Sequence, residues 1–289
     1  MMKVSDIRIR DPFVLTDYKT NTYYLYGTTD DNTWSGKGTG FNAYRSADLR
    51  EWEGPFSAFR PPEDFWGETN FWAPEVTYYN DHYYMLATFK AEHRCRGTQL
   101  LVADHPLGPF KPLTSSPVTP SEWECLDGTL FIDEKNHPWM VFCREWLQVQ
   151  DGEIYAVRLS QDLKKSMGEP VLLFKASEAN WTVPSKGVNY VTDGPFIYRT
   201  NDDHLLMLWS SHGRYGYSMG VARSPSGTIV GPWKHDHEML FKKDGGHGMI
   251  FRTFEGRLML TVHAPNAMPN ERAILMEVTE ESGKLHLLE

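Results

Sequence analysis

Five short polar motifs along the chain carry side chains that could perform acid–base chemistry. They hold, in chain order, Asp11, Glu75, Asp127, Asp193 and His247. Carboxylates that lie close together raise one another's pKa, and burial adds to the rise, so at least one is expected to keep its proton near neutral pH. A protonated carboxyl beside an ionised one is what general acid–base catalysis requires. An Asp before Pro or Gly is also a common turn former, so each motif alone is a weak signal.

The five motifs stand at equivalent points of a repeated plan, in which a polar turn leads into an apolar strand, a second turn and an aromatic-rich strand. We expect first strands at residues 11–15, 73–78, 127–132, 193–198 and 246–251, and second strands at 23–25, 83–85, 139–142, 205–209 and 258–260. The repeat length is somewhat under about 60 residues, and long helical periodicity is hard to find.

A third strand and a recurring outer turn follow each of several strand pairs, with a Gly-Pro-aromatic tripeptide at 54–56, 108–110 and 231–233. Four strands in each of five units predict an all-β fold, a five-bladed β-propeller with four antiparallel strands per blade. No linker interrupts the series, so we expect residues 1–289 to form a single catalytic propeller domain. Inner strands of a propeller run along its axis, and the polar motifs are therefore expected to meet at one mouth.

The composition argues against several other classes of protein. The 289 residues include 29 Lys and Arg against 38 Asp and Glu, a formal net charge of −9, which disfavours nucleic acid and anionic membranes as partners. No apolar run approaches the roughly 18–20 residues that cross a bilayer. The first residues lack an apolar signal segment, so we expect a cytoplasmic protein, or a secreted or periplasmic one from which a signal peptide was removed. Cys95, Cys125 and Cys143 are too few for a disulfide scaffold and are expected to be buried thiols.

The ordered set of motifs resembles glycoside hydrolase family 43 over essentially the whole chain. The matching segments are Arg10-Asp11-Pro12, Trp72-Ala73-Pro74-Glu75, Asp127-Gly128, Asp193-Gly194-Pro195 and Gly246-His247-Gly248. The resemblance implies a propeller that hydrolyses arabinofuranosyl, xylosyl or galactosyl linkages in plant-type polysaccharide fragments. It also implies an inverting mechanism with a carboxylate base and a carboxylic acid. The family has a third carboxylate besides the base and the acid, which orients the acid and keeps the pKa of the acid high. By position, Asp11 resembles the base and Asp127 resembles this third carboxylate.

The general acid is where the sequence departs from the family pattern. The family usually has Glu before the Gly-Pro of the fourth unit, where this chain has Asp193. The missing methylene withdraws the proton by about one carbon–carbon bond, and displacements of order 1 Å can cost about a hundredfold in rate. Glu145 is the alternative acid, because an antiparallel second strand returns to the face where its first strand began. The sequence leaves Asp193 and Glu145 both open.

Other residues are expected to bind substrate or metal. The ends of the second strands should ring the same mouth and bring His212 and His263 to it, Trp72 and Trp146 could stack on sugars, and Glu75 is expected in the wall. Arg272 matches a late arginine that in the family pairs with the third carboxylate, although a surface ion pair with Glu271 is an equal alternative. The resemblance also implies a hydrated Ca²⁺ on the axis with His247 as its protein contact, whereas the chemistry itself needs no cofactor.

Two alternatives to an inverting hydrolase stay open from the sequence. The altered acid position is compatible with a catalytically silent carbohydrate-binding propeller, and a retaining fructan-type hydrolase would share the five-bladed architecture. The partner expected in every case is an oligosaccharide or polysaccharide. Its sugar and linkage, exo or endo action, and the oligomeric state do not follow from the sequence.

Overall fold

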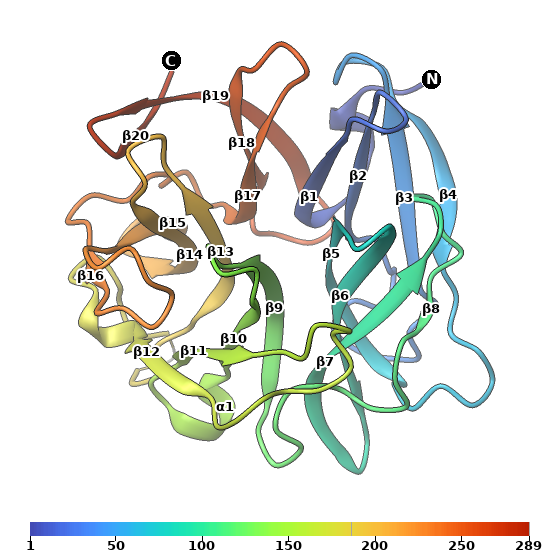
Figure 1. The fold of residues 1–289 in the computed structure, drawn as a ribbon, viewed down its shortest axis with the longest axis horizontal. Helices are drawn as coiled ribbons and strands as arrows, with labels where there is room; N and C mark the ends of the chain where they lie inside the picture. The colour runs from blue at the N-terminus through green and yellow to red at the C-terminus, as the bar shows by residue number, and fades with distance from the viewer. Residues whose placement is uncertain (186, 289) are drawn as a thin grey trace.

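The computed structural model describes residues 1–185 and 187–288, which form five four-stranded antiparallel sheets around a central axis (Figure 1). In every sheet the four strands pair in chain order. The blue N-terminal blade and the red C-terminal blade lie next to each other in Figure 1 and close the ring. The predicted all-β, five-bladed propeller is therefore confirmed.

The strands have the following bounds. The first two blades contain β1 (Arg10–Asp17), β2 (Thr22–Thr28), β3 (Phe41–Ser46), β4 (Glu53–Phe59), β5 (Thr69–Tyr79), β6 (His82–Ala91), β7 (Arg94–Ala103) and β8 (Lys111–Pro112). The third and fourth contain β9 (Cys125–Ile132), β10 (Pro138–Arg144), β11 (Glu153–Arg158), β12 (Val171–Lys175), β13 (Asp193–Arg199), β14 (Leu205–Gly213), β15 (Gly216–Ser224) and β16 (Lys234–His235). The fifth contains β17 (Gly246–Arg252), β18 (Leu258–Ala264), β19 (Arg272–Glu281) and β20 (Lys284–Leu287). The short helices are η1 (Val4–Asp6), α1 (Trp146–Val149) and η2 (Ala176–Glu178).

Aromatic side chains fill the spaces between neighbouring blades. Phe41 and Phe59 of the first blade meet Phe71 and Phe89 of the second, with ring centroids 5.8 Å apart for the Phe41–Phe89 pair and 6.0 Å for Phe41–Phe71. All four rings are buried, and each stabilises the fold by about 1.5–3 kcal/mol. This packing explains why the strands are so rich in aromatic residues and holds the blades at fixed angles around the axis.

Each innermost strand is interrupted near its start by a β-bulge. Its register with the second strand shifts there in all five blades. The first bulge residue has a positive φ in every case: 53° at Asp11, 46° at Ala73, 55° at Asp127, 50° at Gly194 and 41° at His247. Four of the five are not glycine, and each such residue costs roughly 1–2 kcal/mol of backbone strain. Bulges of this kind re-aim side chains next to active sites, and here they turn them toward the axis.

The bulges also correct the equivalence expected among the five motifs. Glu75 lies beyond the bulge of β5, so its counterpart in β9 is Thr129 and not Asp127. Asp193 precedes the bulge of β13, because Gly194 takes the left-handed position. The repeat in the sequence pairs the polar residues with each other, whereas the backbone geometry pairs the bulges.

The ring closes between the first and last blades through polar contacts near the axis. Arg8 and Arg272 form an isolated antiparallel bridge, and the Ile9 N–H donates to the Glu271 carbonyl at 3.3 Å. Arg10 Nη1 donates to Glu271 Oε1 at 3.0 Å, and the two side chains are only 12% and 1% exposed. A buried ion pair thus joins residues 261 positions apart in the chain.

Glu271→Ala is expected to lower the free energy of unfolding by about 3–5 kcal/mol, because removal of one partner leaves the other charge buried and unpaired. Denaturant titration measures this change. Glu53→Ala is the matched control, since the Arg45–Glu53 pair is about half exposed (47% and 48%) and should contribute below about 1 kcal/mol. Equal losses in the two variants would contradict the assigned role of the Arg10–Glu271 pair.

Two further expectations concern helices and thiols. None of the helices in residues 1–185 and 187–288 is long and apolar enough to cross a membrane. Cys125 and Cys143 are buried free thiols as predicted, but Cys95 is partly exposed.

Candidate functional site

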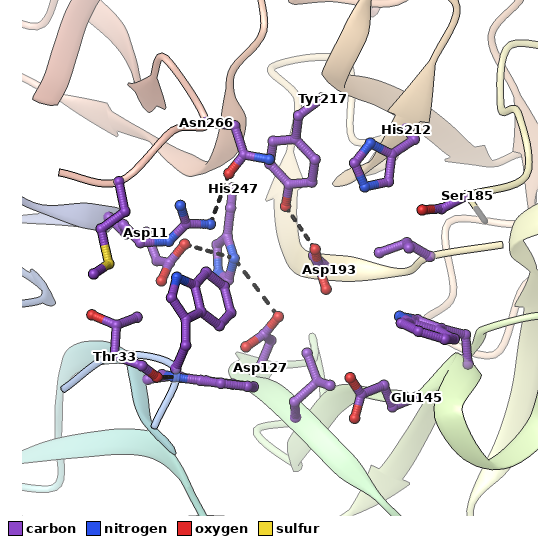
Figure 2. Close-up of a pocket in the computed structure, with 17 residues that line it drawn as sticks. Asp11, Thr33, Asp127, Glu145, Ser185, Asp193, His212, Tyr217, His247 and Asn266 are labelled. Carbon is purple, nitrogen blue, oxygen red and sulfur yellow. Dashed lines mark hydrogen bonds and ion pairs between the residues drawn. The ribbon is translucent and has the colours of Figure 1, made fainter. Parts of the chain in front are cut away.

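A cavity of about 350 Å³ opens at the end of the axis where the inner strands begin (Figure 2). Its lining combines carboxylates, aromatic rings, cationic or imidazole groups, and smaller side chains. These are Asp11, Asp127, Glu145 and Asp193; Trp34, Trp72, Trp146 and Tyr217; Arg10, His212 and His247; and Thr33, Leu126, Ser185, Val191, Asn266 and Met268. Flat rings with convergent polar groups form the kind of surface that binds a sugar.

Most of the residues predicted from the sequence line this cavity. They are Asp11, Trp72, Asp127, Glu145, Trp146, Asp193, His212 and His247. Three predicted residues, Glu75, His263 and Arg272, are not part of the lining. Figure 2 shows Asp11, Asp127 and Asp193 grouped around the ring of His247.

Asp11 is held as an ionised carboxylate by several donors. The Thr28 hydroxyl donates to its Oδ2 at 2.6 Å, and His247 Nδ1 lies 3.2 Å from its Oδ1. Burial alone would raise the pKa of Asp11, but His247, Arg10 and the other donors outweigh burial and the pKa is lowered. Asp11 can therefore accept a proton at neutral pH.

Asp127 and Asp193 are shifted in the opposite direction. Burial is the largest cause and raises the pKa of Asp127 to about 7, although His247 opposes the rise. Burial also raises the pKa of Asp193, and the charge of Asp11 adds to the rise, against His247 and the Tyr217 hydroxyl. Tyr217 donates to Asp193 Oδ2 at 2.9 Å, and the Gly194 N–H donates to Asp127 Oδ2 at 3.1 Å. Both raised pKa values favour the protonated carboxyl, and the pKa of Asp127 is high enough for part of it to stay protonated near neutral pH.

His247 is the centre of this carboxylate group. Its Nδ1 lies 3.2 Å from Asp11 Oδ1 and 3.7 Å from Asp127 Oδ2. Burial would lower its pKa, but the carboxylates around it prevail and the pKa is raised. The surrounding carboxylates thus favour the protonated imidazole, whose positive charge balances part of theirs.

The side chains do not form a calcium cage by themselves. Within the described residues, no group of three or more His, Cys, Asp or Glu side chains is arranged to hold a metal ion. Calcium prefers six to eight oxygen ligands, and the one imidazole on the axis faces carboxylates. A hydrated Ca²⁺ with His247 as its single protein contact needs no such cage, and it stays a prediction from the sequence.

The three predicted residues outside the lining occupy different places. Glu75 lies beside Thr129, and burial raises its pKa to about 8. His263 is fully buried, its pKa is lowered to about 3 by burial, and its Nδ1 accepts the Asp11 N–H at 3.1 Å. The Arg272 guanidinium donates to the backbone carbonyls of Ser5, Pro269 and Glu271 instead of to a carboxylate.

Arg10, and not Arg272, is the arginine that lines the cavity and pairs with Glu271. It also donates to Asn266 Oδ1 at 2.8 Å and packs against the Trp34 ring at 4.9 Å. Its position directly before Asp11 was the feature of the sequence from which its place in the cavity could have been predicted.

Tyr217 and Asn266 were not predicted at all. Tyr217 pairs with His212 across the β14–β15 hairpin, so extending the strand-end argument to third strands would have found Tyr217. Asn266 lies in the segment after β18, and its Oδ1 is 3.2 Å from His263 Nε2. A segment without repeat pattern offers no comparable signal in the sequence.

The arrangement places an ionised carboxylate and a proton-bearing carboxyl pair around one sugar-sized cavity on a propeller axis, which is the chemistry of a glycoside hydrolase. The sequence model described as "Glycosyl hydrolases family 43" matches residues 4–280. The chain belongs to this family of glycosidases.

Solved structures agree with this membership. The endo-arabinase from Bacteroides thetaiotaomicron VPI-5482 is 46% identical, with 98% of this chain and 99% of that chain covered and a TM-score of 0.91. A thermostable family-43 glycoside hydrolase is 25% identical over 98% and 93% of the two chains, with a TM-score of 0.81. An exo-1,5-alpha-L-arabinanase from a bovine ruminal metagenomic library, at 18% identity, 98% and 97% coverage and a TM-score of 0.72, shares the fold. No curated protein matches the chain significantly.

Proposed function

We propose that the protein is an inverting hydrolase of neutral arabinose-containing polysaccharide fragments, with Asp11 as general base, Asp193 as general acid and Asp127 as the carboxyl that tunes the acid. The observation that carries the proposal is the opposite shift of two pKa values at one cavity, lowered at Asp11 and raised at Asp193. Environments that separate the pKa values of two carboxyls assign the base and the acid.

Asp11 would remove a proton from the attacking water. Its side chain is positioned by Thr28, and its backbone N–H by His263, so the carboxylate is oriented before substrate binds. Proton transfer by a positioned group contributes about 10²–10⁴-fold to a rate.

Asp193 would protonate the leaving oxygen. The bulge at Gly194 supports this role despite the short side chain, because an added Cβ at Gly194 would collide with the His247 ring. The backbone of β13 therefore comes as close to the axis as a glycine permits, which offsets part of the missing methylene.

A neutral arabinose polymer is the substrate class favoured by two features. A uronic acid would find its cationic neighbours in the described lining already paired, because Arg10 forms an ion pair with Glu271 and His247 lies against Asp11. The similarity to a structure described as an endo-arabinase supports arabinose over xylose or galactose. Both alternatives remain outcomes of the test below.

The test is release of reducing sugar from linear arabinan, xylan, galactan and polygalacturonate under equal conditions. We expect arabinan to be preferred by at least about tenfold, and polygalacturonate to be inert. Parallel assays of Asp11→Asn exclude a contaminating hydrolase. Absence of release from every polymer, or cleavage of polygalacturonate, would overturn the proposal.

The pH dependence of kcat/KM is expected to be bell-shaped with its optimum on the acid side of neutral. Asp11 must be ionised, and because its pKa is lowered, activity falls only at pH values below the ordinary range of Asp. Asp193 must be protonated, and because burial raises its pKa, activity declines only at pH values above the ordinary range of Asp. A rate that continues to rise up to about pH 9 would contradict the assignment.

A further inference from the structure

We infer that Glu145 is not a proton donor but an ionised acceptor for hydroxyls of the leaving-group sugar, and that Arg96 is the positioning residue that holds it so. The inference rests on the proposed function, because it presumes that a sugar leaves from the side of Asp193. It assigns a substrate-contact role to Glu145 and a supporting role to an arginine that does not line the cavity.

Arg96 reaches the cavity wall from the second blade and is almost completely buried. Its Nη1 forms an ion pair with Glu145 Oε2, and its Nη2 donates to Asn70 Oδ1 at 3.2 Å. The guanidinium also packs over the Trp72 ring, 4.6 Å from the centroid. Three contacts in different directions fix its charge behind both Trp72 and Glu145.

A second carboxylate completes the charge balance around Arg96. Glu124 Oε2 lies 3.8 Å from Arg96 Nη1, and Glu124 Oε1 lies 2.5 Å from Lys90 Nζ. Burial opposes ionisation of Glu124, but Lys90 and Arg96 prevail and lower its pKa. Two cations thus face Glu124 and Glu145, and the carboxyls of Asp127 and Asp193 also act on the Arg96 charge. Of these four, only Glu124 and Glu145 form ion pairs with Arg96 in the described structure.

This pairing determines what Glu145 can do chemically. An arginine stays protonated at every working pH, and a carboxylate paired with it in a buried place stays ionised. An ionised carboxylate has no proton to give to a leaving oxygen, but it accepts strong hydrogen bonds from hydroxyls. By contrast, Asp193 forms no ion pair with an arginine or lysine in the described structure.

Backbone hydrogen bonds also fix the position of Glu145. Its N–H donates to the Glu124 carbonyl at 2.8 Å, and its own carbonyl accepts the Gln148 N–H at 2.9 Å at the start of α1. The side chain is 12% exposed, and it lines the cavity beside Trp146. A fixed, mostly desolvated acceptor next to an aromatic ring has the features of a sugar contact.

The position of Glu145 indicates which sugar it contacts. In Figure 2, Asp193 and Glu145 lie on one side of His247, and Asp11 lies on the other. In a single displacement the water enters beside the base and the leaving group departs beside the acid. Glu145 is therefore placed toward the departing sugar.

Glu145→Gln tests the role with two substrate series. On aryl arabinofuranosides, whose phenols carry no sugar hydroxyls, we expect the dependence of kcat/KM on phenol pKa to keep its wild-type slope. On arabino-oligosaccharides we expect kcat/KM to fall about 10- to 100-fold through a raised KM, as for a lost hydrogen bond to a charged group. Glu122→Gln, which makes the same change at an exposed glutamate two residues before Glu124, is the matched control.

Arg96→Met and Arg96→Lys test the positioning role. We expect Arg96→Met to raise KM for oligosaccharides about as much as Glu145→Gln does, and the double variant to show much less than the product of the two effects. Arg96→Lys should restore part of the loss. If Arg96→Met does not fold, Arg96→Lys and Glu145→Gln, each checked by thermal unfolding, still show whether Arg96 positions Glu145.

Different results would overturn the role of Glu145, the role of Arg96 and the proposed function. A steeper slope on phenol pKa in Glu145→Gln would make Glu145 the acid and overturn the inference, and so would unchanged oligosaccharide kinetics. Multiplicative effects in the double variant would remove the link between Arg96 and Glu145. If Asp11→Asn retains full activity, the proposed function itself fails, whatever the Glu145 variants show.

Discussion

Asp11→Asn is expected to lower kcat by about 10²–10⁴-fold on arabinan and on aryl arabinofuranosides alike, with little change in KM. An amide cannot accept the proton of the attacking water, and a base acts in the transition state regardless of the leaving group. The fold should survive, because Asn tolerates the left-handed conformation that residue 11 adopts, with φ at 53°. Steady-state kinetics measure the loss of the base, and thermal unfolding shows whether the fold is retained.

The control for this variant is Asp104→Asn. The Asp104 side chain is 96% exposed at the end of the second blade's third strand, and the same chemical change there should leave kcat unaltered. Equal activity of Asp11→Asn and wild-type protein would remove Asp11 from the chemistry.

Asp193→Asn is expected to produce a loss that depends on the leaving group. Sugar leaving groups need protonation, so oligosaccharide turnover should fall about 10²–10⁴-fold, whereas activated phenols should lose far less. The alkaline limb of the pH profile should also disappear or move, because the raised pKa of Asp193 contributes to it. Kinetics across a series of phenols from pH 4 to about 9 would measure both.

A uniform loss across all leaving groups would instead assign Asp193 a structural role. The hydrogen bond from Tyr217 makes this comparison informative, because Asn at position 193 can still accept it through its amide oxygen. Tyr217→Phe removes the donor without touching the acid, and it should alter the pH profile more than the leaving-group slope.

The sequence predicted the number of blades and most of the cavity because both follow from the repeat. Apolar strands, aromatic second strands and polar turns recur in each unit, and a propeller brings the start of every unit to the axis. Asp11, Asp127 and His247 are therefore placed correctly by the pattern alone.

The local backbone was not predictable to the same extent. A β-bulge adds one residue without a strong sequence signal when the bulge residue is Asp, Ala or His, and it shifted the equivalence of Glu75 and Asp193. Glu75 consequently lies beside Thr129 outside the lining. A prediction from the alternation of side chains along a strand assumes a constant register, so it cannot detect the shift that a bulge introduces.

Side-chain contacts between neighbouring blades were also not predictable from the sequence. Arg10 meets Glu271 across 261 residues, and Arg96 of the second blade meets Glu145 of the third. Strand-end reasoning brings Glu145 to the mouth, but it says nothing of a partner that arrives from a neighbouring blade. The role that we infer for Glu145 depends on that partner.

The anomeric form of the first-formed sugar, observed by proton NMR during rapid wild-type hydrolysis, tests the central claim most directly. Asp11 as base and Asp193 as acid act in a single displacement, so the account predicts that the new reducing end has the anomeric configuration opposite to that of the bond cleaved. A first-formed sugar with the original configuration would require a covalent intermediate and would contradict the account.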